Sequence, residues 1–182
     1  PFCKDRCGIS IGEGAGLMLL SKSPAALAVL GYGESSDAYH PSAPSPDGRG
    51  AIAAMREALA GSHLTPEDIG YISLHGTATP ANDKTEALAV NAVFGQRVPC
   101  SSTKYLTGHT LGAAGITEAV MGALLIAEDL PLPAQDFSRS PCDETLTPCG
   151  LLREQESLKS KVVLSNAFAF GGNNAVLVIG ES

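Results

Sequence analysis

Short apolar runs alternate with segments of helical spacing along this chain. The runs predict five strands, at residues 25–33, 69–74, 99–102, 161–164 and 174–179. Residues 8–21 alternate loosely and then become apolar, which predicts one or two further strands. Because strands and helices follow one another, the pattern favours an α/β fold with a layered sheet covered on both faces.

Three segments have the spacing of helices. The first is predicted to begin at Asp47, as its N-cap, and to run to about Ala60, with Gly61 ending it. The second is predicted over residues 79–94, because Thr-Pro opens it and its apolar positions share one face. The third, over residues 111–128, is apolar nearly all round, so we expect it to be central and buried.

Length and charge limit the classes of function. A chain of 182 residues with 44% apolar residues is long enough for one well-packed domain. Its net charge of -7 argues against a nucleic-acid partner, which requires a basic surface. The longest apolar stretch, residues 112–127, is interrupted by Thr117 and Glu118, so no membrane span is expected. No signal peptide is visible, which favours a cytoplasmic location.

The cysteines are predicted to be ordinary thiols. An odd number in a chain without a visible secretory signal favours free thiols, and their spacing does not match common zinc motifs. No metal site is expected among them, and no cofactor is expected. The five residues are Cys3, Cys7, Cys100, Cys142 and Cys149.

His75 is the first candidate for chemistry. It directly follows the strand predicted at residues 69–74, and Gly76 allows the backbone to turn sharply before the next helix. The carboxyl edge of a sheet is where α/β folds place their ligands. The pattern alone leaves two alternatives, a functional histidine and a histidine that caps the strand end for structural reasons.

His109 is the second candidate, because it precedes the apolar helix. The positive end of that helix disfavours an imidazolium, and a neutral ring can donate one N–H to a developing negative charge. Glu118 lies within the helix, and a buried carboxylate needs a partner, for which Lys104 is the obvious candidate. The alternative is a structural Lys–Glu pair beside a histidine without a role.

Two glycine-rich segments have competing interpretations. Phe170, Gly171 and Gly172 form either an oxyanion loop, in which backbone N–H groups approach a ligand, or an ordinary tight turn between strands. Residues 12–16 superficially resemble a phosphate-binding loop but lack the Lys-Ser/Thr that follows in one. We therefore expect those glycines to permit close packing of a sheet.

Taken together, the motifs resemble those of the elongating β-ketoacyl-acyl-carrier-protein synthases, which are condensing enzymes with a thiolase fold. The resemblance extends over nearly the whole chain and corresponds to the C-terminal half of such an enzyme. It implies a mixed five-stranded sheet with helices on both faces. The shared segments, in order, are Lys4–Arg6 with Gly8, Gly12–Gly16, Ser36–His40, His75–Pro80, Ser102–Lys104, Thr107–His109, Leu111–Gly115 with Glu118, Ser165–Asn166 and Phe170–Gly172.

The resemblance also implies a decarboxylative condensation. A cysteine thiolate accepts an acyl group from a carrier protein, and the enolate formed from malonyl-carrier protein then attacks it. In this scheme His75 and His109 donate hydrogen bonds to the malonyl thioester oxygen as it becomes an enolate. Lys104 and Glu118 would order the His109 region and tune its protonation. The backbone N–H of Phe170 would serve the oxyanion hole, and its side chain would gate the acyl pocket.

Further site residues are expected on the same basis. The candidates for substrate binding are Thr77, Thr79, Phe168, Gly171 and Gly172. The candidates for a bound Na⁺ or K⁺ are Glu118, Ser165 and Asn166.

The nucleophile that this chemistry requires is not found in the chain. None of the cysteines lies at a strand-to-helix turn flanked by small residues, and the family's nucleophile belongs to the first half of the enzyme. We therefore expect residues 1–21 to be the tail of the N-terminal half and residues 22–182 to be the C-terminal domain. This polypeptide alone is not expected to catalyse condensation.

Three functions compete. An enzyme half is favoured because His75, Lys104 and His109 are all retained, which a purely structural partner does not require. The alternative is a non-catalytic partner similar to a chain-length factor. A degradative thiolase is disfavoured, because residues 168–174 contain no cysteine.

The resemblance implies partners as well. Acyl- and malonyl-loaded carrier protein would dock on a local basic patch, for which Arg49 and Arg56 are candidates, or on the other half. The full-length protein is expected to be a homodimer. Ala169, Asn173 and Ser73 depart from the common pattern of relatives, which suggests a divergent subgroup that serves a polyene or polyketide pathway rather than housekeeping fatty acid synthesis.

Overall fold

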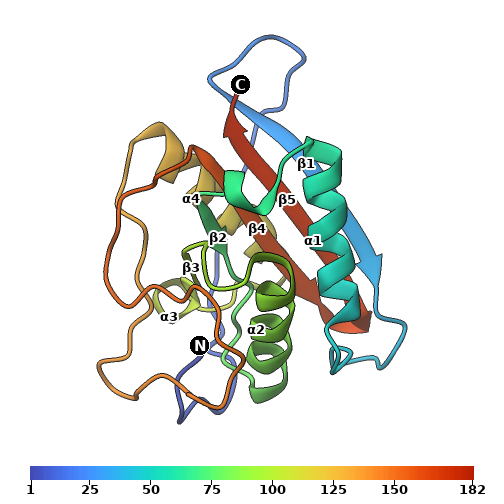
Figure 1. The fold of residues 1–182 in the computed structure, drawn as a ribbon, viewed down its shortest axis with the longest axis vertical. Coiled ribbons are helices and arrows are strands. Elements are labelled where there is room, and N and C mark those ends of the chain that lie inside the picture. Colours follow the sequence, from blue (N-terminus) through green and yellow to red (C-terminus); the bar gives the residue numbers. More distant parts are fainter.

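A single mixed sheet organises the molecule. The computed structural model describes residues 1–182, and its strands lie in the order β1-β5-β4-β2-β3 (Figure 1). β5 is antiparallel to both β1 and β4, whereas β2 is parallel to β4 and to β3. The mixed five-stranded sheet is therefore confirmed. The strands are β1 (Leu27–Ser36), β2 (Tyr71–Ser73), β3 (Cys100–Ser101), β4 (Val162–Ala169) and β5 (Asn173–Glu181).

Helices cover both faces of the sheet, as predicted. The helices are α1 (Arg49–Ser62), α2 (Pro80–Phe94), α3 (Lys104–Thr107) and α4 (Ala114–Ala127), and the 3₁₀ turns are η1 (Pro66–Asp68), η2 (Leu111–Ala113) and η3 (Phe170–Gly172). Successive side chains of β4 point to opposite faces. Leu164 therefore joins the core with Met55 of α1 and Val90 of α2, whereas Val163 joins the core with Ala119 of α4.

The N-terminal segment differs from its prediction, because residues 8–21 form no strand. Its only bridge joins Ile11 to His109. The side chains of Leu17 and Leu19 are 97% and 95% exposed. The apolar pattern indicates burial, but no element of this chain covers Leu17 and Leu19, and a sequence pattern does not specify which element supplies the cover.

The glycines of this segment do permit close packing, but against a different partner from the predicted sheet. A Cβ atom on Gly12 would lie 2.1 Å from the carbonyl oxygen of Thr107. A Cβ atom on Gly16 would lie 3.0 Å from the side chain of Ile116. The segment thus crosses residues 107–116, the stretch that carries His109 and opens α4.

The ends of α1 also differ from the prediction. The N-cap is Gly48, with φ of 66°, while Asp47 accepts a hydrogen bond from the N–H of Arg49 at 3.1 Å. The helix continues past Gly61 and ends before His63, whose φ of 57° is left-handed. The helix therefore tolerates Gly61 within its last turn, and the observed end lies two residues beyond the predicted one.

α4 is only partly buried, although its sequence is apolar nearly all round. Ala119 and Gly122 pack against the sheet, but Leu124 on α4 and Leu111 just before it are 46% and 58% exposed. One side of this apolar helix therefore lies open in this chain. No helix of the structure is both long enough and apolar enough to cross a membrane.

Candidate active site

The residues predicted to be catalytic lie together at the carboxyl ends of the parallel strands. The parallel strands β2, β3 and β4 end there, where α/β folds place their ligands. His75 follows β2, Lys104 opens α3 just after β3, and Phe168 lies near the end of β4. The rings of His75 and His109 meet edge to face, with centroids 5.2 Å apart and planes at 85°. The ring of Phe168 lies 6.0 Å from that of His75 on centroids.

A buried carboxylate fixes the backbone that carries His75. Glu86 on α2 is 1% exposed, and its two oxygens accept the N–H groups of His75 and Gly76 at 2.8 and 2.7 Å. The side-chain amide of Asn166 donates to the same carboxylate at 3.2 Å. Burial raises the pKa of Glu86, and these donors act in the opposite direction.

A second buried carboxylate, Asp83, holds the end of the same loop. It accepts the N–H of Ala78 at 3.2 Å and that of Phe2 at 2.7 Å, and Nε of Arg6 lies 3.5 Å from it. Sequence reasoning missed both Glu86 and Asp83. The available signal was two acids on the buried face of a helix that directly follows the histidine, since buried carboxylates need donors and the loop N–H groups are nearest.

Left-handed backbone flanks both histidines. Ala78 has φ of 66° after His75, and Leu111 has φ of 53° after His109. For residues other than glycine this conformation costs about 1 kcal/mol or more, and it is concentrated at functional sites. Position 76 requires glycine, because a Cβ atom added there would lie 2.4 Å from the Cβ of Ser102.

The His75 ring is buried and uncharged at neutral pH. His75 is 5% exposed, and its Nδ1 atom is buried without a hydrogen-bond partner. Burial lowers the pKa of His75 well below its usual value, and the charges of Lys104 and His109 act in the same direction. A neutral ring with an unpartnered nitrogen can exchange hydrogen bonds with a bound substrate.

The protonation of His109 follows from its own hydrogen bond. The N–H of Leu111, at the start of η2, donates to Nδ1 of His109 at 3.3 Å. Because Nδ1 accepts, the neutral ring carries its proton on Nε2 and can donate it to a substrate oxygen. Burial lowers the pKa of His109, and the charge of Lys104 lowers it further. The Leu111 amide thus favours the neutral ring, and the role of that ring in catalysis stays a prediction.

Lys104 and Glu118 form a buried ion pair through Nζ and Oε1. The residues are 5% and 3% exposed, and Oε2 of Glu118 has no partner. Burial raises the pKa of Glu118 to about 7, against the opposing effect of Lys104. The pair joins α3 to α4 below His109, which suits the ordering and tuning role that stays a prediction.

The Phe170 turn follows directly from the strand that carries Phe168. Phe170 is 72% exposed, and Gly171 and Gly172 have φ of 85° and 76°. The N–H of Gly171 donates to the carbonyl of Pro41 at 2.7 Å. The turn therefore needs its glycines for conformational reasons, and its roles as oxyanion donor, substrate contact and gate stay predictions.

The two threonines of the His75 loop contact one another. Their hydroxyl oxygens lie 3.1 Å apart, and Oγ1 of Thr79 accepts the N–H of Asn82 at 3.2 Å, which caps α2. Thr77 is 7% exposed. Thr79 thus has a structural task in addition to its predicted contact with substrate.

The residues expected to hold a monovalent cation are divided by the sheet. Asn166 faces Glu86 on the α2 side, and its Oδ1 is buried without a partner. Ser165 is its neighbour in β4 and therefore projects to the opposite face, where α4 packs. Glu118 is already engaged with Lys104. A cation at this set stays a prediction.

Comparison with known proteins agrees with this geometry. Residues 27–137 match the family model described as beta-ketoacyl synthase, C-terminal domain. The chain is 43% identical over 190 residues to the 3-oxoacyl-[acyl-carrier-protein] synthase 2 of Synechocystis sp. (strain ATCC 27184 / PCC 6803 / Kazusa), covering 97% of this chain and 45% of that protein. It is 38% identical over 191 residues to the protein of that name from Staphylococcus aureus (strain COL), covering 98% and 45%.

Solved structures give the same result. A ketosynthase (ApeO) in complex with its chain length factor (ApeC), from Xenorhabdus doucetiae, superposes with a TM-score of 0.95 and 52% identity, covering all of this chain and 46% of that one. The ishigamide ketosynthase/chain length factor superposes with a TM-score of 0.90 and 35% identity, with the same coverage.

The fold is thus that of the thiolase-like condensing enzymes. The chain belongs to the beta-ketoacyl synthase family, and it carries the family's C-terminal domain. It spans about half the length of the curated relatives that it matches.

Proposed function

We propose that this chain is the C-terminal half of a 3-oxoacyl-[acyl-carrier-protein] synthase. The full-length enzyme would join an enzyme-bound acyl group to malonyl-carrier protein, with loss of CO₂. The observation that supports this most strongly is the pair of neutral imidazoles, His75 and His109, whose rings meet edge to face with centroids 5.2 Å apart.

The two rings suit the decarboxylation step. Cleavage of the carboxylate from the malonyl group releases CO₂ and leaves an electron pair, which spreads onto the thioester oxygen as an enolate. Neutral donors stabilise that oxygen in a site from which water is excluded, and neither ring carries a charge that burial would penalise. Nε2–H of His109 is one such donor, and the ring of His75 supplies the other.

Condensation then completes the cycle. The enolate carbon attacks the carbonyl carbon of the acyl-enzyme thioester, and the oxygen of this carbonyl becomes negative. The Phe170 N–H and that of the nucleophile would stabilise this charge. Collapse forms the new carbon–carbon bond, breaks the acyl–sulfur bond and returns a thiolate to the enzyme.

The nucleophilic cysteine would come from outside this chain. We assign residues 1–21 to the preceding half of the enzyme and residues 22–182 to the C-terminal domain. Two exposed apolar surfaces support this division, the one at Leu17 and Leu19 and the other at Leu111 and Leu124. Docking of a first half on both would bury them.

A reconstitution experiment tests the proposal. The full-length protein should convert acyl- and malonyl-carrier protein into a β-ketoacyl thioester, detected by mass spectrometry of the carrier. The 182-residue chain alone should give none. Turnover by this chain unaided, or no turnover by a folded full-length protein whose first half contains the cysteine, would contradict it.

A second candidate is a non-catalytic partner of an active synthase. Two structural neighbours are complexes of a ketosynthase with a chain length factor, and the presence of such a factor in both supports this alternative. Retention of His75, Lys104 and His109 favours the enzyme, because a partner that only shapes a pocket needs no neutral imidazole pair. Sequencing of the first half decides between them, since a synthase requires cysteine at the nucleophile position.

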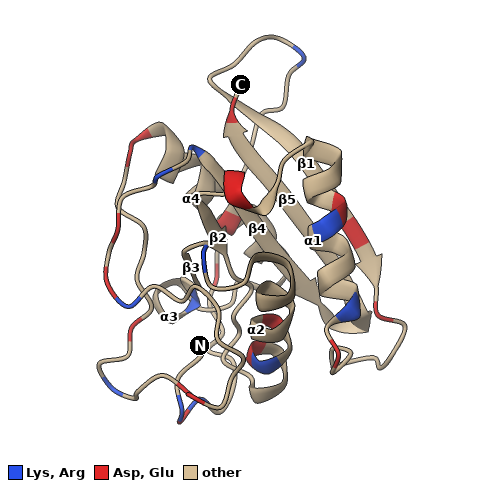
Figure 2. Cartoon of the chain, viewed as in Figure 1, with Lys and Arg blue, Asp and Glu red and all other residues tan.

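Carrier protein and a second subunit are the partners that we propose. One structural neighbour has an acyl-carrier protein in complex with its ketosynthase. Figure 2 shows Lys and Arg scattered over the elements rather than gathered into one surface. Arg49 and Arg56 both lie on α1 and are exposed, so they stay the local docking candidates. The pathway that we propose is fatty acid, polyketide or polyene synthesis, for which the acyl chain length of the product is the test.

A further inference from the structure

The proposed function uses none of the five cysteines, yet four of them lie in two close pairs. Cys3 and Cys142 are bridge partners on adjacent backbone segments. Cys149 lies close enough to Cys100 to help raise the pKa of its thiol. Cys7 is exposed, and all five are free thiols.

The geometry of the first pair is that of a cross-strand disulfide position. Cys3 and Cys142 lie directly opposite one another in an antiparallel bridge. The N–H after each cysteine donates to the carbonyl before the other, at 2.8 and 3.0 Å. This pattern defines a non-hydrogen-bonded pair, whose Cα atoms are typically about 4.5 Å apart with side chains close together. A disulfide spans Cα separations of about 4.4–6.8 Å, so no backbone movement is required.

We propose that Cys3 and Cys142 form a reversible disulfide when the protein meets a hydroperoxide. One thiolate attacks the peroxide, the O–O bond breaks, and a sulfenic acid and one molecule of water or alcohol result. The second thiol attacks the sulfenic sulfur, the S–S bond forms, and water leaves. Together the two thiols lose two electrons and two protons, and the peroxide is reduced. A dithiol reductant reverses the step by exchange.

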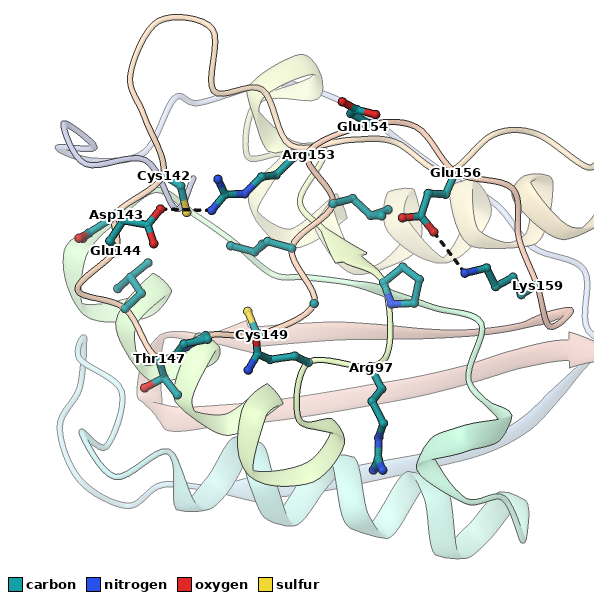
Figure 3. Close-up of a pocket in the computed structure, with 17 residues that line it drawn as sticks. Arg97, Cys142, Asp143, Glu144, Thr147, Cys149, Arg153, Glu154, Glu156 and Lys159 are labelled. Carbon is teal, nitrogen blue, oxygen red and sulfur yellow. Dashed lines mark hydrogen bonds and ion pairs between the residues drawn. The ribbon is translucent and has the colours of Figure 1, made fainter.

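The pair is accessible to such an oxidant. Both cysteines are half-buried, and Cys142 lines an open surface cavity of about 760 Å³ (Figure 3). Figure 3 shows Cys142 beside the ion pair of Glu144 and Arg153 at one end of this cavity. Burial raises the pKa of Cys142, so the oxidation should become faster as the pH rises and the thiolate becomes more abundant.

Cys100 and Cys149, the second pair, are less suited to oxidation. Cys100 is fully buried in the core, and burial together with Cys149 raises its pKa well above the usual value. Such a thiol is inert. Cys149 lines the same cavity as Cys142, so a Cys142–Cys149 bond is the specific rival outcome.

The disulfide would connect to the histidine site through the residue before Cys3. Phe2 is fully buried, and its N–H donates to Asp83, the carboxylate that also holds Ala78 in the His75 loop. An ion pair at 2.6 Å between Arg6 and Asp143 already joins the two segments that the bond would link. A covalent link there restricts the unfolded chain and should raise the midpoint of thermal unfolding by several degrees.

Peptide mapping tests this proposal without reference to condensing activity. The full-length protein is treated with hydrogen peroxide, free thiols are alkylated, and proteolytic peptides are identified by mass spectrometry. We expect one joined pair of peptides containing Cys3 and Cys142, released by dithiothreitol. The Cys7→Ser variant should keep it, and both Cys3→Ser and Cys142→Ser should lose it together with the rise in the unfolding midpoint.

Two results would overturn the proposal. One is a joined pair that contains Cys142 and Cys149. The other is complete alkylation of Cys3 and Cys142 after the exposed Cys7 has been oxidised. Cys3→Ser and Cys142→Ser alter different segments. If both variants lose the joined peptides, misfolding of one variant cannot explain the loss.

Discussion

The loops that carry His75 and His109 meet at the candidate active site, but different contacts hold them there. His75 is held from within the domain, because Glu86 accepts its N–H and Asp83 holds the end of its loop. His109 is half-buried, and its backbone exchanges hydrogen bonds with Ser10 and Gly12 of the N-terminal segment at 2.7 and 3.0 Å. The backbone of the His75 loop is therefore held by carboxylates of the C-terminal domain, and Phe2 and Arg6 reach it only through Asp83. The backbone of His109 instead pairs directly with the segment that we assign to the preceding half.

The difference indicates which residues set the geometry of each ring. Removal of a carboxylate should disturb the His75 loop and the stability of the whole domain. A change at Ser10–Gly12 should disturb His109 and leave the His75 loop in place.

The largest effect on stability is expected for Glu86→Ala. The N–H groups of His75 and Gly76 would lose their acceptor inside the protein, at roughly 1–3 kcal/mol for each buried group. We expect chemical denaturation to show a loss of about 2–6 kcal/mol. Lys84→Ala on the exposed side of the same helix is the control and should change stability by less than about 0.5 kcal/mol. Equal stability of the two variants would show that Glu86 does not hold the loop.

Gly12→Ala should disturb the other loop. The added Cβ would lie 2.1 Å from the carbonyl of Thr107, which no real contact permits, so the segment must move. Overpacking of this kind costs about 1–3 kcal/mol. The matched control is Gly112→Ala, where nothing lies within 4 Å of the added atom. In Gly12→Ala the NMR chemical shifts of the His109 ring should change, whereas those of the His75 ring should not. The reverse pattern would contradict the claim that the two loops are held by different contacts.

Acidification should weaken the protein through His75. Its pKa is lowered on folding, so below about pH 6.5 the unfolded chain binds more protons than the folded one, and stability falls. The contribution is at most about 1.4 kcal/mol per pH unit. Glu118, with its pKa raised to about 7, acts in the opposite direction over the same window.

The difference between wild type and His75→Gln isolates the histidine, because Glu118 is common to both. Urea denaturation between pH 7 and pH 5 should show a smaller acid loss in the variant, relative to its own stability at pH 7. An identical pH dependence in both proteins would mean that His75 is not buried uncharged.

The smallest effect is expected for the ion pair below His109. The charge of Lys104 lowers the pKa of both rings, so the double variant Lys104→Met/Glu118→Gln should let the pKa of each ring rise toward its ordinary value. NMR titration measures both rings in one experiment. A fall in either pKa would contradict the assignment of Lys104 as the tuning charge.

The sequence predicted the elements of the C-terminal domain because its signals are local. Thr79 and Pro80 open α2 as expected, and the consecutive apolar residues at the start of β4 reflect burial on both faces of the sheet. It missed Glu86 and Asp83, because their shortest hydrogen bonds come from backbone N–H groups, which residue types do not reveal. It also misassigned residues 8–21, since apolar residues indicate burial without naming what buries them.

The central claim is that two uncharged imidazole rings share one oxygen of the malonyl group, and the most direct test measures decarboxylation alone. The full-length protein, with its nucleophile already acylated, is supplied with malonyl-carrier protein, and the release of CO₂ is followed. We predict a loss of about 100- to 1,000-fold for His75→Ala and for His109→Ala, with acylation of the cysteine unchanged in His109→Ala. Decarboxylation at the wild-type rate in either folded variant would contradict the account.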